Sequence, residues 1–239
     1  MAPFIYGDYP IAWGSGFQDP ASDWLICLID LHDQIIFYLI IIATLVLWFT
    51  ATSLWHGSTL SGATGHLNLL QHGNRLELIW TITPALVLWA IGIPSLRLLY
   101  LMDELIDPEI TVRVVGSQWY WSYSKDDGGD PFDSFLVAAA DLPSGGLRQL
   151  AVDSFIVLPV YTAIRLLVTS NDVIHSFALP SLALKVDAIP GRLNLASLFI
   201  NRTGVFYGQC SELCGVLHGF MPIALHAVTL LNYPLDTKY

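Results

Sequence analysis

Two long apolar segments near the amino terminus dominate the pattern of hydrophobic and polar residues. Leu31–Trp55 contains only a few polar side chains, and Leu78–Leu101 contains a single charged one, Arg97. Each segment exceeds the roughly 20 residues that a helix needs to cross a hydrocarbon core about 30 Å thick. A pair of buried helices in a soluble protein is the alternative, but core helices are seldom this long. The polar connection His56–Glu77 therefore predicts a transmembrane hairpin that leaves both chain termini on one side of the membrane.

From Ile110 onward the pattern changes to short β-branched runs separated by turns. Ile110–Val115 alternates, and Ile164–Thr169 is similar. Short strands with regular turn signals predict an all-β sandwich or barrel. The chain is thus expected to be an α+β membrane protein with two parts: residues 1–109, with spans at about 31–55 and 78–101, and the β domain of residues 110–239.

Composition and charge agree with a membrane location. Hydrophobic residues make up 54% of the chain and charged residues only 13%, about half of the roughly 25% usual in soluble domains. Residues 1–112 carry ten acidic and two basic side chains. With so few cations the positive-inside rule is weak, so the hairpin geometry carries the prediction that the β domain lies outside. Acidic side chains outnumber basic ones, and the sequence contains no basic cluster of the kind that binds nucleic acid.

Four soft metal ligands lie within twelve residues, in the run Gln209–Met221: Cys210, Cys214, His218 and Met221. Thiolate, imidazole and thioether ligands favour copper over magnesium, calcium or manganese. The apolar pattern places this run between two strands, so the ligands are expected on a loop. A disulfide between Cys210 and Cys214 is the alternative, but the nearby His218 and Met221 favour metal binding.

A second imidazole is needed, and His175 follows a β-branched run, although a lone histidine there is more often a core residue. A mononuclear blue-copper site uses one thiolate, and a zinc site leaves Met221 without a role. Two copper ions that share Cys210 and Cys214 use every donor, with the backbone carbonyl of Glu212 as a further ligand. Such a centre suits electron transfer. The Glu212 carboxylate could also bind a hard cation such as Mg²⁺, or be an ordinary solvated loop residue.

Several longer motifs resemble the cytochrome c oxidase subunit II family, over nearly the whole chain. They are Ile79–Pro84, Pro94–Glu104, Gln118–Tyr123, Pro180–Asn194 and Gly208–Cys214 with His218 and Met221. The resemblance implies a cupredoxin-like (Greek-key) barrel after the helical hairpin, and a dinuclear copper centre called CuA.

The resemblance also implies a role for each matching residue. The implied copper ligands are His175, Cys210, Glu212 through its carbonyl, Cys214, His218 and Met221. The Glu212 side chain would reach a Mg²⁺ site shared with subunit I, near the stretch that contains Asp187 and Arg192. Trp119 matches the residue that receives electrons from cytochrome c, although an aromatic core residue is the simpler interpretation. Glu77 matches the acid at the mouth of a proton path, and from sequence alone is an ordinary interfacial carboxylate.

Cytochrome c is basic, so an acidic face should attract it. Asp133, Asp153 and Asp172 match docking acids of the family, whereas Ser124 and Asn171 stand where acids are often found. Asp126, Asp127 and Asp130 could compensate, although a run of charges is more often simply a solvated face.

The implied function is an electron-transfer subunit that passes electrons from cytochrome c to haem a of subunit I, for oxygen reduction coupled to proton pumping. Its partners would be cytochrome c, subunit I, other oxidase subunits and membrane lipid. A related quinol oxidase class lacks the copper ligands, and a membrane-anchored copper carrier or zinc protein is the alternative from another class. Roughly 30 residues precede the first span and no signal peptide is evident. We therefore expect the mitochondrial inner membrane, with the copper domain in the intermembrane space; a bacterial plasma membrane is the alternative.

Overall fold

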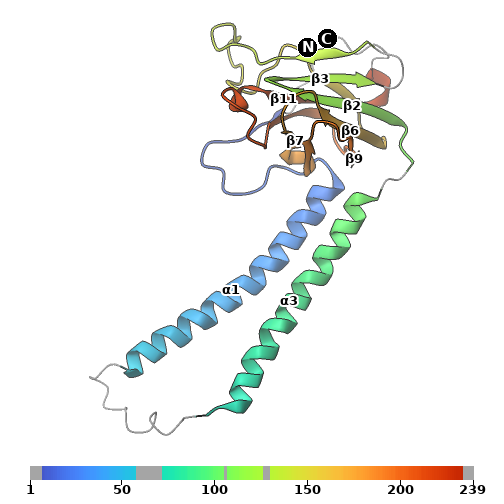
Figure 1. The fold of residues 1–239 in the computed structure, drawn as a ribbon. Helices are drawn as coiled ribbons and strands as arrows, with labels where there is room; N and C mark the ends of the chain where they lie inside the picture. The colour runs from blue at the N-terminus through green and yellow to red at the C-terminus, as the bar shows by residue number, and fades with distance from the viewer. Residues whose placement is uncertain (1–6, 58–71, 105–106, 126–129, 234–239) are drawn as a thin grey trace. The chain divides into compact units, whose positions relative to one another are not determined.

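The chain divides into two compact units in a computed structural model that describes residues 7–57, 72–104, 107–125 and 130–233. The segment before Leu28 and the residues from Met102 onward form one unit, and Leu28–Leu101 form the other (Figure 1). Most of the predicted connection His56–Glu77 lies outside the described residues, as do Asp126 and Asp127.

Two long helices confirm the predicted hairpin. Helix α1 spans Asp23–Gly57 and helix α3 spans Asn74–Asp103. Both are long and apolar enough to cross a membrane, and none of the most apolar stretch of either helix is buried inside the protein. Hydroxyl groups within these stretches are satisfied locally: Thr44 Oγ1 donates to the carbonyl oxygen of Ile40 at 2.8 Å, as a bilayer requires of polar groups.

The β domain consists of two main sheets and one separate strand pair (Figure 1). The first sheet has the order β1 (Gly7–Asp8), β10 (Gly204–Gln209), β11 (Pro222–Val228) and β5 (Ile156–Pro159). The second has the order β4 (Phe132–Ser134), β3 (Tyr120–Lys125), β2 (Ile110–Ser117), β6 (Ile164–Ser170) and β9 (Asn194–Leu198). The separate pair is β7 (His175–Leu179) with β8 (Leu184–Ala188). Three short 3₁₀ helices occupy Pro180–Leu182, His218–Phe220 and Leu230–Asn232.

Alternation along the strands builds one core between the two main sheets. In β6 every second side chain is buried, beginning at Ile164 and including Leu166 and Val168, as the sequence pattern predicts. Strand β2 pairs in parallel with β6, and the buried side chains of both join Phe206 of β10 and Leu225 of β11 in a single cluster. The second sheet thereby supports the strands that carry the metal loop.

The segment before helix α1 packs on the β domain. Strand β1 pairs in parallel with β10, and the Asp8 carboxylate lies 2.5 Å from the Arg202 guanidinium. Ser22 caps α1: its Oγ accepts a hydrogen bond from the Leu25 N–H at 3.2 Å and donates to the carbonyl oxygen of Leu182 at 2.8 Å. The predicted division at residue 109 grouped this segment with the hairpin, whereas these contacts connect it to the β domain.

Candidate metal centre

The predicted metal loop joins two neighbouring antiparallel strands. Strand β10 ends at Gln209 and β11 begins at Pro222, and these two residues are paired in the sheet. The loop folds back on itself through hydrogen bonds from the His218 N–H to the Gly215 carbonyl oxygen (3.2 Å) and from the Phe220 N–H to the Leu217 carbonyl oxygen (2.9 Å). Gly215 has a φ of +125°, a backbone conformation that residues other than glycine rarely adopt.

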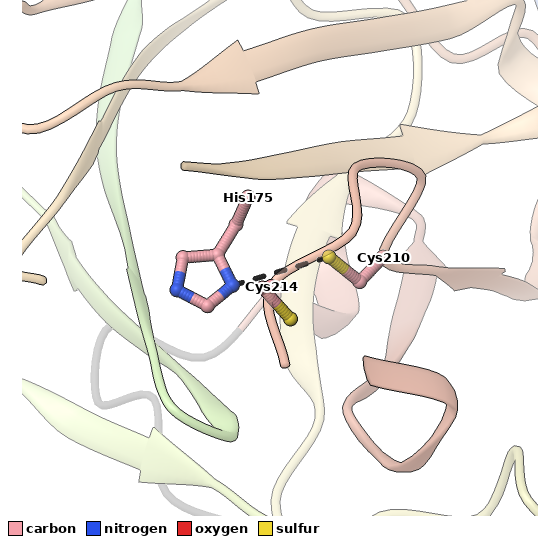
Figure 2. A group of neighbouring side chains, drawn as sticks. All are labelled: His175, Cys210 and Cys214. Carbon is pink, nitrogen blue, oxygen red and sulfur yellow. Dashed lines mark hydrogen bonds between the residues drawn. The ribbon is translucent and has the colours of Figure 1, made fainter. Parts of the chain in front are cut away.

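The first strand of the separate pair brings His175 to this loop. His175, Cys210 and Cys214 place their ligand atoms within 4.8 Å of one another, and all three side chains are buried. Figure 2 shows them pointing toward one another, with His175 Nδ1 4.0 Å from the Sγ atom of Cys210. Both cysteines are free thiols, so the structure does not adopt the disulfide alternative. Three soft donors converge as the sequence predicts.

The remaining predicted ligands surround the same two thiols. His218 Nδ1 and Met221 Sδ each lie 3.6 Å from the Sγ atom of Cys214. The carbonyl oxygen of Glu212 lies 3.3 Å from the Sγ atom of Cys210. Every donor counted from the sequence is therefore in contact with at least one thiol, and the set is suited to a soft metal such as copper.

A carboxylate holds the ring of His175 in place. His175 Nε2 lies 2.8 Å from Asp172 Oδ1, which leaves Nδ1 facing the thiols. Asp172 Oδ1 also accepts from the Val173 N–H at 2.6 Å, and Oδ2 accepts from the Gln118 N–H at 2.7 Å. Burial alone would raise the pKa of the Asp172 carboxyl, but hydrogen bonds from His175, Gln118 and Val173 outweigh it and lower the pKa. The sequence suggested only a docking role for Asp172; its position three residues before His175 was the available signal.

Two tryptophans of the β2–β3 hairpin contact the metal loop. A Cβ atom on Gly215 would lie 3.3 Å from Cζ2 and 3.4 Å from Nε1 of Trp119, so the Trp119 indole rests on the loop backbone beside Cys214. The buried Trp121 donates from Nε1 to the Met221 carbonyl oxygen at 3.2 Å. Trp119 thus lies against the metal loop, and Trp121 supports the end of the loop that carries Met221.

Two of the predicted docking acids lie close together on the β domain. Asp133 of β4 accepts a hydrogen bond from Ser122 Oγ at 2.6 Å, and Asp153 accepts from the Phe135 N–H at 2.8 Å. Both acids are exposed. The Phe135 ring stacks on Tyr120, the neighbour of Trp119, with 4.6 Å between ring centroids. Tyr120, Phe135, Asp133 and Asp153 therefore form an acidic and aromatic edge of the β domain beside Trp119.

The other predicted residues lie apart from the thiols. The Glu212 side chain is exposed on the loop. Asp187 of β8 accepts a hydrogen bond from Ser176 Oγ at 2.8 Å, and the Ser176 carbonyl oxygen accepts from the Ser211 N–H at 3.0 Å. Glu77 is exposed in the first turn of α3, in the helical unit.

The two thiols are close enough to influence each other's protonation. Burial, together with the neighbouring Cys210, raises the pKa of the Cys214 thiol to about 12. A metal binds the thiolate, so metal binding must release this proton.

Comparison with known proteins decides the family. Residues 110–228 match the family described as cytochrome c oxidase subunit II, periplasmic domain, and residues 10–98 match the corresponding transmembrane domain. The chain belongs to the cytochrome c oxidase subunit II family. It is 52% identical over 235 residues to cytochrome c oxidase subunit 2 of Mycosarcoma maydis, which covers 96% of this chain and 92% of the relative. It is 48% identical over 241 residues to the Pneumocystis carinii protein of the same name, at 98% and 97% coverage.

Among solved structures, the chain is similar to the periplasmic domain of subunit II of cytochrome oxidase of Bradyrhizobium japonicum. The TM-score is 0.49 at 48% identity, over 54% of this chain and 90% of that one. Membership of the cytochrome c oxidase subunit II family confirms the predicted helical hairpin followed by a cupredoxin-like β domain. The chain is thus a subunit of an oxidoreductase complex with other oxidase subunits as partners. Its His175, Cys210 and Cys214 cluster fits a copper site in that family.

Proposed function

We propose that this subunit receives electrons from cytochrome c at a dinuclear copper centre, CuA, and passes them to haem a of subunit I. Oxygen would then be reduced to water in subunit I, with coupled proton pumping. The observation that carries the proposal is the convergence of four further donor groups on two free, buried thiols.

The donor set favours two copper ions over one metal of another kind. His175, His218, Cys210, Cys214, Met221 and the Glu212 carbonyl are the proposed ligands. A single zinc ion would be satisfied by two thiolates and two imidazoles, which would leave Met221 and the Glu212 carbonyl beside the thiols without a role. When bound by these residues, two copper ions would supply a one-electron acceptor and donor.

The residues around the thiols are suited to electron transfer without rearrangement of the metal ligands. Asp172 fixes the His175 ring, and Trp121 fixes the Met221 backbone. Because these two ligands are held by neighbouring residues, their geometry should change little when charge is added. The proposed point of arrival for electrons is Trp119, which rests on the loop beside Cys214.

The proposed cytochrome c surface is the acidic and aromatic edge beside Trp119. Asp133 and Asp153 are exposed there, and the formal net charge of the chain is −10. A basic partner approaches such a surface faster at low salt, since opposite charges steer the encounter. Asp172, also named as a docking acid, is proposed to act mainly through His175.

Three further assignments are proposed from family membership and position. The exposed Glu212 carboxylate is proposed to bind a Mg²⁺ ion shared with subunit I, since carboxylate oxygen suits that hard cation. Glu77 is proposed to lie at the mouth of a proton path. Helices α1 and α3 would contact lipid of the mitochondrial inner membrane, with the β domain in the intermembrane space; the fungal origin of close relatives favours this membrane over the bacterial one.

Rapid mixing of the oxidised enzyme with reduced cytochrome c tests the proposal. Absorbance of copper and of haem would be followed separately. The proposal predicts that copper is reduced first and that haem a follows as copper is reoxidised. Reduction of haem a while the copper signal stays unchanged would contradict it.

A further inference from the structure

Gln118 connects the two separate elements that carry the metal ligands. Its backbone N–H donates to Asp172 Oδ2 at 2.7 Å, and Asp172 in turn holds His175. Its side-chain Nε2 donates to the carbonyl oxygen of Cys214 at 2.8 Å. One residue therefore contacts both the turn before β7 and the metal loop, and it directly precedes Trp119.

The contact between Trp119 and the metal loop depends on a close approach of backbone to indole. A Cβ atom on Gly215 would lie 3.2 Å from Gln118 Nε2 and 3.3 Å from Trp119 Cζ2. The glycine lets the indole rest directly on the loop, one residue after Cys214. Between the β2–β3 turn and the metal loop, the Gln118 amide supplies a directed hydrogen bond to the backbone of Cys214, a proposed ligand residue.

We propose that Gln118 is a positioning residue that holds the Trp119 indole against the metal loop beside Cys214. This inference rests on the proposed function, since it concerns the step from Trp119 to the metal. A glutamine suits the position because its amide is a neutral donor that reaches the Cys214 carbonyl oxygen. A glutamate of the same length would place an acceptor against that oxygen and leave the carbonyl without its donor.

Gln118 is exposed, so direct contact with cytochrome c is the competing explanation. Gln118→Glu separates the two roles. The added negative charge strengthens attraction to a basic partner, so a docking role predicts binding as tight as wild type or tighter and an unchanged transfer rate within the complex. A positioning role predicts a slower transfer rate in the bound complex, without weaker binding.

Asn171→Asp is the matched control. Asn171 is also an exposed carboxamide near the centre, and its Nδ2 donates to Ser117 Oγ at 3.1 Å instead of the metal loop. The substitution introduces the same charge on the same surface without changing the partner of the Cys214 carbonyl. Gln118→Leu is the second test variant, because it removes the donor at similar size and adds no charge.

The experiment measures electron transfer in a preformed complex of purified oxidase and cytochrome c, after photochemical reduction of the cytochrome. Copper content, the electron spin spectrum and the dissociation constant are measured in parallel. For Gln118→Glu and Gln118→Leu we expect about a tenfold lower first-order rate, which corresponds to about 1.4 kcal/mol, with wild-type copper content. Asn171→Asp should transfer at the wild-type rate.

Wild-type rates in both Gln118 variants would overturn the inference, as would a loss confined to binding affinity. If Gln118→Glu fails to retain copper, Gln118→Leu decides by the same criterion. Failure of the proposed function has a different signature: the copper of the wild-type enzyme would then accept no electron from cytochrome c.

Discussion

Asp172 Oδ1 lies 2.8 Å from His175 Nε2, on the side of the imidazole opposite the thiols. The carboxylate is fixed in turn by the N–H groups of Gln118 and Val173. Carboxylates in this position orient a histidine ligand and determine which ring nitrogen is free for the metal. Asp172 is therefore part of the candidate metal centre and not only a proposed docking acid.

Replacing Asp172 by asparagine should weaken metal binding. Loss of a carboxylate behind a histidine ligand typically lowers metal affinity about 10–100-fold. We expect Asp172→Asn to lose copper to a chelator faster than wild type and to shift the electron spin spectrum. Both are measured on purified enzyme by metal analysis during chelator challenge.

Asp153→Asn is the matched control, with the same charge change at an exposed acid that does not contact a ligand. It should keep its copper and instead raise the KM for cytochrome c at low ionic strength, with the difference vanishing as salt screens the charges. Equal copper retention in the two variants would show that Asp172 acts only in docking.

The two tryptophans of the β2–β3 hairpin should have separable effects. Trp119→Phe is expected to slow copper reduction by cytochrome c while leaving copper content intact, because Trp119 contacts the loop without supporting a ligand by a hydrogen bond. Trp121→Phe removes the donor to the Met221 carbonyl oxygen. We expect it to change the copper spectrum and to destabilise the domain by about 1–3 kcal/mol. Stopped-flow kinetics and thermal unfolding measure the two effects, and the same outcome in both variants would contradict these roles.

Two glycines near the centre should tolerate alanine very differently. A Cβ atom on Gly208 of β10 would lie 1.8 Å from the carbonyl oxygen of Ala178 in β7, the strand that begins with His175. Gly208→Ala must push these strands apart, at a cost of about 1–3 kcal/mol. Gly219 of the metal loop has open space around its Cβ position. Thermal unfolding and copper retention should therefore fall in Gly208→Ala and stay near wild type in Gly219→Ala; equal losses would argue against the close approach.

The stability of the metal-free protein should depend on pH through Cys214. Its pKa is raised to about 12 by burial and by Cys210, whereas an unfolded thiol has a pKa of about 8.5. The protonated thiol thus stabilises the fold fully below about pH 8.5, and this contribution is lost at up to about 1.4 kcal/mol per pH unit as the pH rises toward the folded-state pKa.

In the copper-loaded protein the thiols are already deprotonated, so this slope should be absent. Unfolding temperatures of both forms across the alkaline range measure the difference, with metal-free Cys214→Ser as the control that lacks the thiol. Parallel curves for the metal-free and loaded wild-type proteins would contradict the assignment.

The sequence was sufficient for those features that depend on local patterns. The spans follow from uninterrupted apolar length, and strands such as β6 follow from alternation. Four donors share one loop, so their spacing alone indicated soft-metal chemistry. His175 was found by counting the donors that a soft metal needs, not from its own surroundings.

Contacts between distant segments could not be predicted in the same way. The packing of Ala21 and Ser22 on the 180–182 turn joins residues about 160 positions apart. The close approach of Gly208 to Ala178 and the hydrogen bond from Gln118 to Cys214 appear only when strands are placed in space. No periodicity in the sequence encodes such contacts, and the last two of them join elements that carry predicted ligands.

Metal analysis combined with electron spin resonance of the oxidised enzyme is the sharpest test of the proposed dinuclear copper centre. We predict two copper ions per chain and a hyperfine pattern from one unpaired electron shared by two equivalent copper nuclei. Conversion of either Cys210 or Cys214 to serine should abolish that pattern, because both thiolates are proposed to bridge. A spectrum from one isolated copper ion, or zinc in place of copper, would contradict a shared dinuclear centre.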